Sequence, residues 1–330
     1  MSRSKIALLY VGGSIGMKVN QKTGCIEPLE SLSEVHRFLP ELQKEVSLQF
    51  FSVANVGSSE INPSHWEEIA LLIRDIYEDF DGFVVVHGTN TMSYTAAALS
   101  FALQGLSKPV VLTGALLPIN DLAGDGRMNL VFAIRTAQLD IAEVCIALGP
   151  NVLRGTRAKK VEASFLQTFE SPNCMPLADF SREVSLADHR IVRRKRTLNC
   201  TPSFNPNVVL LSVYPGMPEA FMDSVLAALP DGIILRTYGP GMLSKELFPW
   251  LQKVTEAEIP ICITSQALRG MVDLHKYRKQ LVLEKLGIIS GKNMTFECAV
   301  VKMMWALTQS KDPRKIRNLM EKNIVGEMDD

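Results

Sequence analysis

The sequence has no long apolar run, no excess of charge of either sign and no paired cysteine motif. Lys and Arg together equal Asp and Glu at 35 each, so the formal net charge is zero. A balanced chain has no overall field that attracts nucleic acid or an anionic membrane, and no stretch approaches the roughly 20 apolar residues of a membrane span. The six cysteines include no Cys-x-x-Cys pair, which argues against zinc or a disulfide framework. We therefore expect no nucleic acid, membrane or metal as a partner.

The start of the chain predicts a cytoplasmic protein. Arg3 and Lys5 precede the apolar run Ile6–Val11, an order that superficially suggests a secretory signal. The run is shorter than the roughly 7–15 residues of a signal core. It ends in Gly-Gly, as a buried strand does before a tight turn. We expect a cytoplasmic location, in which the scattered cysteines stay reduced.

Short apolar strands alternate with helices in the first half of the chain. The apolar runs that end at a glycine are Ile6–Val11, Gly82–His87, Pro109–Thr113 and Glu143–Leu148. Amphipathic segments between them predict helices over His65–Phe80 and Tyr94–Leu106. Such strands and helices specify a parallel sheet covered on both sides. Ligands of these sheets bind at the carboxyl ends of the strands, which indicates the loops at residues 12–16 and 88–92.

The second half repeats this alternation after an irregular basic stretch at residues 188–207. The stretch fits a nucleic-acid patch, but we favour a solvated interdomain linker because the chain is neutral. Strands are predicted at Val208–Tyr214, Gly232–Tyr238 and Pro260–Ser265, and helices at Glu219–Leu229 and Lys245–Glu256 and near the C-terminus. The fold class is therefore α/β with two three-layer domains. The larger N-terminal domain, residues 1–187, has a mostly parallel sheet, and the smaller C-terminal domain, residues 208–330, has a parallel sheet.

The first candidate loop, Val11-Gly-Gly-Ser-Ile-Gly16, places a hydroxyl directly after two glycines. The glycines allow a sharp turn and a close approach of backbone to ligand. They also leave amide N–H groups that can stabilise an oxyanion. Ser14 is thus a candidate nucleophile, although Gly-Gly-Ser after a strand is often only a turn. The loop is no dinucleotide fingerprint, because Gly-x-Gly-x-x-Gly is absent.

The second candidate loop, Val84-Val-Val-His-Gly-Thr-Asn-Thr-Met92, joins an apolar strand to the next helix. Thr89 is a candidate nucleophile or polar positioner, and we expect Thr91 to cap the helix. His87 suggests a general base, but a histidine at a strand end is more often a hydrogen-bonded structural residue. We adopt the structural interpretation.

Two further segments supply polar groups. Arg154-Gly-Thr-Arg-Ala-Lys-Lys160 contains two lysines, and desolvation of either one would lower its pKa toward that of a base. The segment itself does not choose between Lys159 and Lys160. Residues 55–62 are rich in small polar side chains, which suits a small polar ligand or a helix cap. No Ser-His-Asp motif, P-loop or metal-ligand cluster is present, so hydroxyl-based catalysis without a metal or cofactor is the leading enzymatic interpretation.

Together these motifs resemble the bacterial-type L-asparaginases, most closely their cytoplasmic type I branch. His-Gly-Thr-x-Thr-Met after an apolar strand, combined with Gly-Gly-Ser-Ile-Gly near the start, is a specific pair. The similar segments are Tyr10–Met17, Gly57–Ser59, Asp81–Ser100, Lys108–Pro118, Asp125–Leu130, Arg154–Lys160, Tyr214–Gly216, Leu235–Gly241 and Thr295–Leu307. The resemblance implies the glutaminase/asparaginase fold and hydrolysis of L-asparagine to L-aspartate and ammonia, with L-glutamine accepted by some members. It also implies a homodimer or homotetramer whose active site takes residues from two subunits.

The resemblance assigns roles to particular residues. It makes Ser14 the primary nucleophile and pairs Thr89 with Lys160. It implies that Ser58 binds the α-carboxylate of the substrate. The other substrate-binding positions that it implies are Gly57, Ser59, Gly88, Asn90 and Ala115.

Four positions depart from the family pattern. Ser14 replaces the usual Thr, which keeps the hydroxyl and loses the methyl group that restricts χ1. Asn90 replaces an Asp that pairs with the substrate ammonium, and the lost charge-assisted bond is worth about 1.5–3 kcal/mol. Cys25 stands where the pattern has a Tyr that closes on the nucleophile. Met242 stands where the partner subunit contributes an Asn.

We therefore predict an L-asparagine amidohydrolase that uses Ser14 and the Thr89–Lys160 pair, with activity lowered by these replacements. Two alternatives stay open. One is a weakened or inactive relative that binds a small metabolite. The other is an amidase for a substrate without an α-ammonium, whose counter-charge Asn90 removes. The resemblance also places residues 264–266 where some type I relatives bind an effector asparagine.

Overall fold

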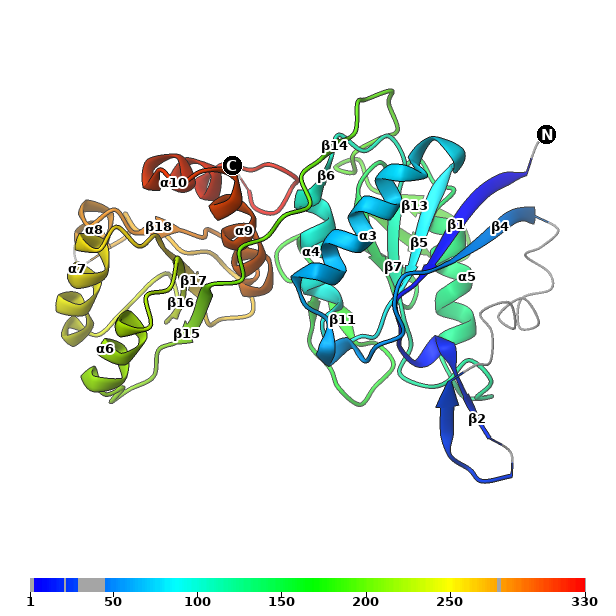
Figure 1. Ribbon diagram of the computed structural model, residues 1–330, viewed down its shortest axis with the longest axis horizontal. Coiled ribbons are helices and arrows are strands. Elements are labelled where there is room, and N and C mark those ends of the chain that lie inside the picture. Colours follow the sequence, from blue (N-terminus) through cyan, green and yellow to red (C-terminus); the bar gives the residue numbers. More distant parts are fainter. Residues whose placement is uncertain (1–2, 21, 29–44, 278–279, 330) are drawn as a thin grey trace. The chain divides into compact units, whose positions relative to one another are not determined.

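The computed structural model describes residues 3–20, 22–28, 45–277 and 280–329. The chain divides into two compact units, Met1–Pro202 and Ser203–Asp330, and each unit is built on its own main sheet (Figure 1). No helix within these described ranges is long and apolar enough to cross a membrane.

An eight-stranded sheet forms the centre of the N-terminal unit, in the order β13-β12-β9-β8-β7-β5-β1-β4. Its strands are β1 (Ser4–Tyr10), β4 (Val46–Ser52), β5 (Gly82–Val86), β7 (Val110–Thr113), β8 (Val144–Ala147), β9 (Asn151–Arg154), β12 (Ala178–Phe180) and β13 (Val184–Leu186). The five adjacent strands β8, β7, β5, β1 and β4 are parallel to one another. Strands β9, β12 and β13 continue the sheet in antiparallel fashion. The predicted mostly parallel sheet is confirmed, and the four apolar runs became β1, β5, β7 and β8.

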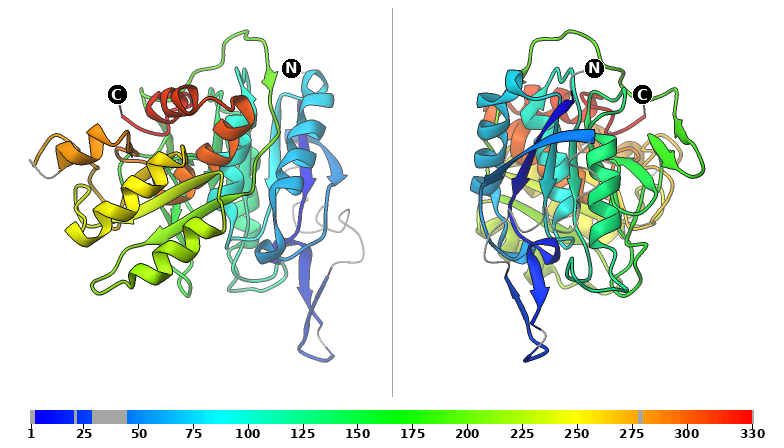
Figure 2. Two further views of the ribbon diagram at one scale, coloured as in Figure 1. Left: turned by 60° about the vertical axis from the view of Figure 1, so that its left-hand side comes forward. Right: turned by 90° about the vertical axis from the view of Figure 1, so that its right-hand side faces the viewer.

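Helices cover both faces of this sheet. Figures 1 and 2 show α3 (Pro63–Asp75) and α4 (Met92–Ala102) on one face and α5 (Gly126–Thr136) on the other. Alternate residues of the central strands, such as Leu8 and Val84, share a buried core with Leu130 of α5. This three-layer arrangement leaves the strand ends as the accessible edge of the sheet.

The ends of α3 and α4 differ from the prediction. Helix α3 begins at Pro63 rather than at His65, because Asn62 caps it: the Asn62 Oδ1 accepts from the Ser64 N–H, and the His65 ring accepts the Asn62 N–H. It ends at Asp75, before a separate 3-10 turn, Tyr77–Asp79. Helix α4 ends at Ala102, because the next two residues form β6 (Leu103–Gln104) and pair with β14 (Asn199–Cys200).

The basic stretch before the C-terminal unit is partly anchored, so the expectation of a fully solvated linker is wrong for two arginines. Arg193 donates to the backbone carbonyls of Leu139 and Ala137 at 2.7 and 2.8 Å. Arg190 pairs with Asp140 at 3.1 Å, and its side chain is only 16% exposed. The two Arg193 bonds satisfy backbone carbonyls just beyond helix α5, which lack intrahelical donors.

The C-terminal unit contains a four-stranded, all-parallel sheet in the order β15-β16-β17-β18. Its strands are β15 (Val208–Ser212), β16 (Gly232–Thr237), β17 (Ile261–Ser265) and β18 (Ile289–Ser290), and its helices are α6 (Glu219–Ala227), α7 (Phe248–Glu256), α8 (Gln280–Lys285), α9 (Phe296–Gln309) and α10 (Pro313–Glu321). Met222 of α6 and Trp250 of α7 pack on one face of this sheet. Helix α9 packs on the other face, where Met303 lies against Gly232. The smaller parallel domain is therefore as predicted.

A buried ion pair joins helix α9 to the residues that follow α10. The Lys302 Nζ lies 2.6 Å from the Glu327 carboxylate, and both side chains are fully buried. The ammonium also donates to the carbonyls of Met320 and Lys322. Burial lowers the pKa of Lys302, and these acceptors offset part of the desolvation.

Candidate active site

The two hydroxyl loops leave neighbouring strands of the N-terminal sheet. Strand β1 pairs with β5 in parallel, with Tyr10 opposite Val86. Ser14 opens a 3-10 turn, Ser14–Gly16, just beyond β1, and Thr89 follows β5. Both loops therefore lie at the carboxyl edge of the sheet, as predicted from the apolar runs.

Glycine backbones bring three loops into contact. Gly13 has φ 93°, and a Cβ on it would lie 2.7 Å from the Gly88 nitrogen. A Cβ on Gly88 would lie 2.8 Å from the Oγ of Ser58. Side chains are sterically excluded at both positions, and Gly13 also has a backbone conformation that favours glycine. The contacts place the Ser14 loop, the Thr89 loop and the Ser58 loop side by side.

Lys160 connects to the second of these loops. It lies in a short hairpin of β10 (Lys159–Lys160) and β11 (Phe169–Glu170). Its Nζ donates to the Thr89 Oγ1 and to the Asn90 Oδ1, both at 2.8 Å. Burial lowers its pKa, and no carboxylate within the described residues pairs with it. Of the two lysines that the sequence left open, Lys160 is the one that reaches Thr89.

Ser58 is held by the residues that follow Thr89. The Asn90 N–H donates to the Ser58 Oγ at 3.3 Å, and the Thr91 hydroxyl donates to the Ser58 carbonyl at 2.6 Å. Thr91 does occupy the N-terminal position of α4, but its side chain makes no capping bond. The predicted cap position is therefore confirmed, but the side-chain capping bond is absent because this hydroxyl donates to another loop instead. Gly57 and Ser59 flank Ser58 and are exposed.

Ala115 lies buried in the loop after β7. The amides of residues 116 and 117 donate to the Asp125 carboxylate at 3.1 and 3.2 Å. The Asn129 side chain donates to the same carboxylate at 2.9 Å. Ala115 shares the core on this face with Ile15, next to the first hydroxyl. Sequence reasoning gave Asp125 and Asn129 no individual role; their spacing of one helical turn at the start of α5 was the available signal.

His87 lies beneath the Thr89 loop and does not face solvent. Its Nδ1 is 2.6 Å from the Gly88 carbonyl oxygen, and its Nε2 is 3.0 Å from the Thr95 hydroxyl. Burial lowers the pKa of His87 to about 4, so the ring is neutral at physiological pH. These contacts agree with the structural interpretation of this histidine.

Two of the replaced positions make other contacts. Cys25 is exposed in the turn between β2 (Met17–Val19) and β3 (Ile26–Pro28), and its Sγ lies 3.9 Å from the Thr23 carbonyl. Met242 belongs to the C-terminal unit, where its N–H donates to the Tyr238 carbonyl at 2.8 Å. Among the described residues, no group of three or more His, Cys, Asp and Glu side chains is placed to hold a metal.

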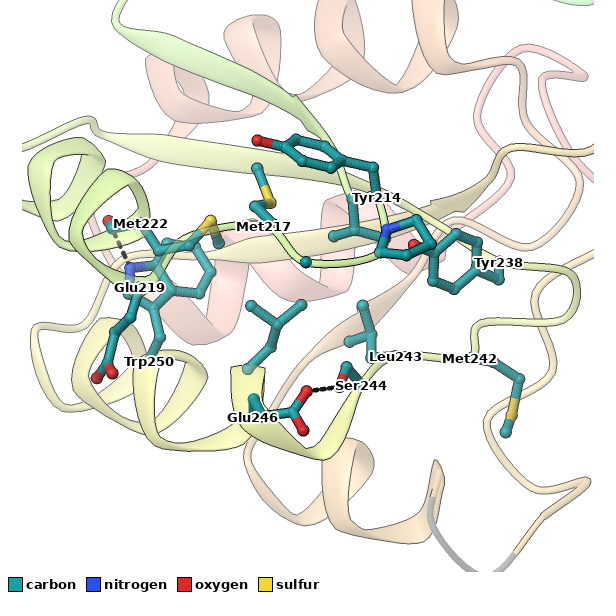
Figure 3. Close-up of a pocket in the computed structure, with 14 residues that line it drawn as sticks. Tyr214, Met217, Glu219, Met222, Tyr238, Met242, Leu243, Ser244, Glu246 and Trp250 are labelled. Carbon is teal, nitrogen blue, oxygen red and sulfur yellow. Dashed lines mark hydrogen bonds between the residues drawn. The ribbon is translucent and has the colours of Figure 1, made fainter.

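A cavity of about 620 Å³ in the C-terminal unit was not predicted. It lies beyond the carboxyl ends of β15 and β16, and its lining includes Tyr214, Met217 and Trp250 (Figure 3). The Trp250 indole donates to the Met222 carbonyl at 2.7 Å, which fixes one wall. Met242 also lines it. The lining comes from separate segments, so no single motif could reveal the cavity.

The fold and the contacts among the three loops define a class: a two-domain α/β protein with hydroxyl groups at the carboxyl ends of the strands of a parallel sheet. Comparison with protein families agrees. Residues 5–192 match the family described as asparaginase, N-terminal, and residues 207–320 match the glutaminase/asparaginase C-terminal domain. The chain therefore belongs to the asparaginase family, which confirms the resemblance seen in the motifs.

Full-length relatives support this assignment. L-asparaginase 1 of Escherichia coli (strain K12) is 32% identical, with 99% of each chain covered. One subunit of the glutamyl-tRNA(Gln) amidotransferase of Pyrococcus furiosus is 33% identical over 98% of this chain and 76% of its own length. Among solved structures, the thermostable L-asparaginase from Thermococcus kodakarensis has a TM-score of 0.92 at 31% identity, with 99% of each chain covered. L-asparaginase I from Vibrio cholerae has a TM-score of 0.92 at 30% identity, covering 99% of this chain and all of its own.

Proposed function

We propose that the protein is an L-asparagine amidohydrolase in which Ser14 is the nucleophile and Thr89 with Lys160 forms the proton-transfer pair. The observation that carries this proposal is the 2.8 Å bond from the Lys160 Nζ to the Thr89 Oγ1, on a loop that packs against Gly13. A desolvated lysine with a lowered pKa is a better proton acceptor than an exposed one.

In the proposed reaction, the Ser14 Oγ attacks the side-chain amide carbon, and the resulting oxyanion is held by backbone N–H groups near Gly13 and Thr89. The proton of the Ser14 hydroxyl ends on the leaving nitrogen, which departs as ammonia. Water then attacks the acyl-enzyme, and the Thr89–Lys160 pair accepts its proton. The acid is released as the Ser14 Oγ recovers a proton. No cofactor takes part in this sequence.

The proposed substrate contacts are those that the family resemblance implies. Ser58 binds the α-carboxylate, beside Gly57, Ser59 and Gly88. The backbone around Ala115, which the Asp125 carboxylate orients, contacts the scissile amide. Asn90 lies at the position of the substrate α-substituent.

A second candidate function is favoured by the contact between Lys160 and Asn90. The Asn90 Oδ1 accepts from the Lys160 ammonium, so this part of the site carries a positive charge without a bonded carboxylate. A substrate α-ammonium placed there meets repulsion of like charges. An amide that keeps the α-carboxylate and lacks the ammonium, such as succinamate, avoids this cost.

The test is ammonia release from L-asparagine, L-glutamine and succinamate by the purified protein and by three variants. Ser14→Ala removes the nucleophile, Thr89→Val removes the hydroxyl bound to Lys160, and Asn90→Asp restores the counter-charge. Turnover of L-asparagine that Ser14→Ala abolishes supports the main proposal. Turnover of succinamate alone supports the second candidate.

Two results would contradict the mechanism. Activity that survives the loss of both hydroxyls excludes Ser14 and Thr89 from the chemistry. Absence of turnover on all three amides by the wild type, with turnover of L-asparagine by Asn90→Asp, indicates a weakened relative that binds a small metabolite.

We further propose a cytoplasmic homodimer or homotetramer. The support is the resemblance to the type I asparaginases and the similarity to the solved structure of a probable cytoplasmic L-asparaginase from Campylobacter jejuni, at 25% identity. Sedimentation velocity of the purified protein distinguishes these assemblies from a monomer.

A further inference from the structure

A chain of buried hydrogen bonds runs from helix α3 to the loop that carries Thr89. The indole N–H of Trp66 donates to the Thr95 hydroxyl at 3.1 Å. That hydroxyl lies 3.0 Å from the His87 Nε2, and the His87 Nδ1 lies 2.6 Å from the Gly88 carbonyl oxygen. All four residues are buried. The series of bonds therefore ends on the peptide group that joins Gly88 to Thr89.

The partners of the ring fix its tautomer. A carbonyl oxygen only accepts, so the His87 Nδ1 must carry the proton that is donated to Gly88. The Nε2 is then the acceptor, and the Thr95 hydroxyl donates to it while accepting from Trp66. The opposite tautomer would place a lone pair 2.6 Å from the carbonyl oxygen. The neutral ring that burial enforces is the form in which every bond of the series is satisfied.

The direction of this carbonyl determines the direction of the next amide. No cis peptide bond occurs among the described residues, so the Thr89 N–H points opposite to the Gly88 carbonyl. Since the carbonyl faces the buried His87 ring, the N–H points away from that ring. It donates to no acceptor within the part of the chain that the structure describes. It is therefore a donor held in place with its hydrogen-bonding capacity unused.

We propose that His87 is a positioning residue, which holds the Gly88–Thr89 peptide so that the Thr89 N–H is aimed at the oxyanion of the reacting amide. The role in turnover rests on the proposed function, whereas the tautomer and the peptide orientation do not. A fixed dipole costs no reorientation when charge develops on the substrate oxygen. His87 touches no reacting atom in this arrangement and acts only through the peptide.

The expected effect is modest and lies in kcat. Breaking the Thr95–His87 hydrogen bond leaves the Thr89 amide in place but less firmly oriented. We expect a loss of transition-state stabilisation about equal to the net contribution of one neutral hydrogen bond. This corresponds to about a threefold to tenfold fall in kcat. Because the oxyanion forms after substrate binding, KM stays within about twofold.

The first experiment does not depend on activity. Side-chain ¹⁵N labelling of the five histidines, with His87→Gln to assign the signal, reports which ring nitrogen is protonated. We expect His87 to be protonated at Nδ1 and neutral from pH 6 to 8. The Thr89 amide signal should shift in Thr95→Val and stay near its wild-type position in Thr95→Ser. A ring protonated at Nε2, or an unmoved Thr89 amide in Thr95→Val, overturns the inference.

The second experiment uses the kinetics of the full chain. Thr95→Val is nearly isosteric and removes the hydroxyl, Thr95→Ser restores it, and Trp66→Phe removes only the outer donor. We expect the fall in kcat in Thr95→Val, most of the rate back in Thr95→Ser, and a smaller effect in Trp66→Phe. Equal losses in the Val and Ser variants, or a rise in KM that matches the fall in kcat, would show a packing role instead.

The two experiments separate the two proposals. A wild type that hydrolyses neither L-asparagine nor succinamate, yet shows the Nδ1-protonated ring and the amide shift, refutes the proposed function and leaves the orientation of the peptide intact. A wild type that is active but has the other tautomer refutes only the role of His87.

Discussion

Acidification should weaken the N-terminal unit through His87. The ring is 1% exposed and both nitrogens are hydrogen-bonded, and burial lowers its pKa from 6.5 to about 4. The unfolded chain therefore binds a proton between pH 6.5 and pH 4 that the folded protein does not bind. Stability falls as pH falls through this window, and His87 contributes no further loss below it.

The magnitude follows from the shift in pKa. At pH 8 both states are neutral at this site and the contribution is zero. At pH 5 His87 is mostly protonated in the unfolded state, which lowers the free energy of unfolding by about 2 kcal/mol. Below pH 4 this loss approaches about 3 kcal/mol. The assay is urea unfolding at pH 8 and pH 5, with the stability of this unit read from hydrogen exchange in β5.

A neutral replacement isolates the histidine from other titrating groups. His87→Gln is less stable than the wild type at pH 8, but its further loss at pH 5 should be smaller by about 2 kcal/mol. His275→Gln, which alters a side chain of the C-terminal unit, should leave the pH dependence of hydrogen exchange in β5 as it is in the wild type. An equal loss in His87→Gln and wild type would show that His87 is not held neutral, and the argument would fail.

Three further substitutions test separate contacts. Because φ at Gly13 is 93°, Gly13→Ala should destabilise the N-terminal unit by more than about 1 kcal/mol and abolish ammonia release. Urea unfolding and a coupled ammonia assay measure the two effects. Thr91→Val should raise KM several-fold with little change in kcat, since its hydroxyl orients Ser58; steady-state kinetics will show the division. Lys302→Met should cost about 3–5 kcal/mol of C-terminal stability by leaving the Glu327 charge buried and unpaired, and adding Glu327→Gln should recover part of it in calorimetry.

Local sequence patterns predicted more of the fold than of the candidate site. The central strands were predictable because a strand buried on both faces is largely apolar, and because a glycine follows both β1 and β5 two residues after the strand ends. The predicted start of α3 at His65 is two residues late because the prediction followed the apolar face of the helix, although Asn62 followed by Pro63 is also a helix-start signal. The anchoring of Arg193 was missed because its acceptors are backbone carbonyls of another segment, which leave no trace in side-chain patterning.

In the candidate site too, some features leave a pattern in the sequence and others do not. The Gly-Gly-Ser and His-Gly-Thr motifs indicated both loops, because glycine is required where backbones touch. Which of Lys159 and Lys160 contacts Thr89 could be decided only from the structure or from the family pattern. Adjacent residues of a short strand point to opposite faces, and the sequence does not say which face is inward. Asp125 stayed without a role for a related reason: its partners are the backbone amides of residues 116 and 117, which any residue type supplies.

The replacement at position 90 changes charge rather than geometry, and its two consequences oppose each other. Backbone contacts among the glycine loops hold Thr89 in place whichever side chain follows it, and the Asn90 amide still accepts from Lys160 at 2.8 Å. A carboxylate there would pair with the lysine and raise its pKa, which makes it a weaker proton acceptor at neutral pH. It would also supply the counter-charge that a substrate ammonium needs. Asn90 therefore favours a lysine that deprotonates readily and a substrate without an α-ammonium, so the gain in binding L-asparagine in Asn90→Asp should be accompanied by a lower rate on succinamate.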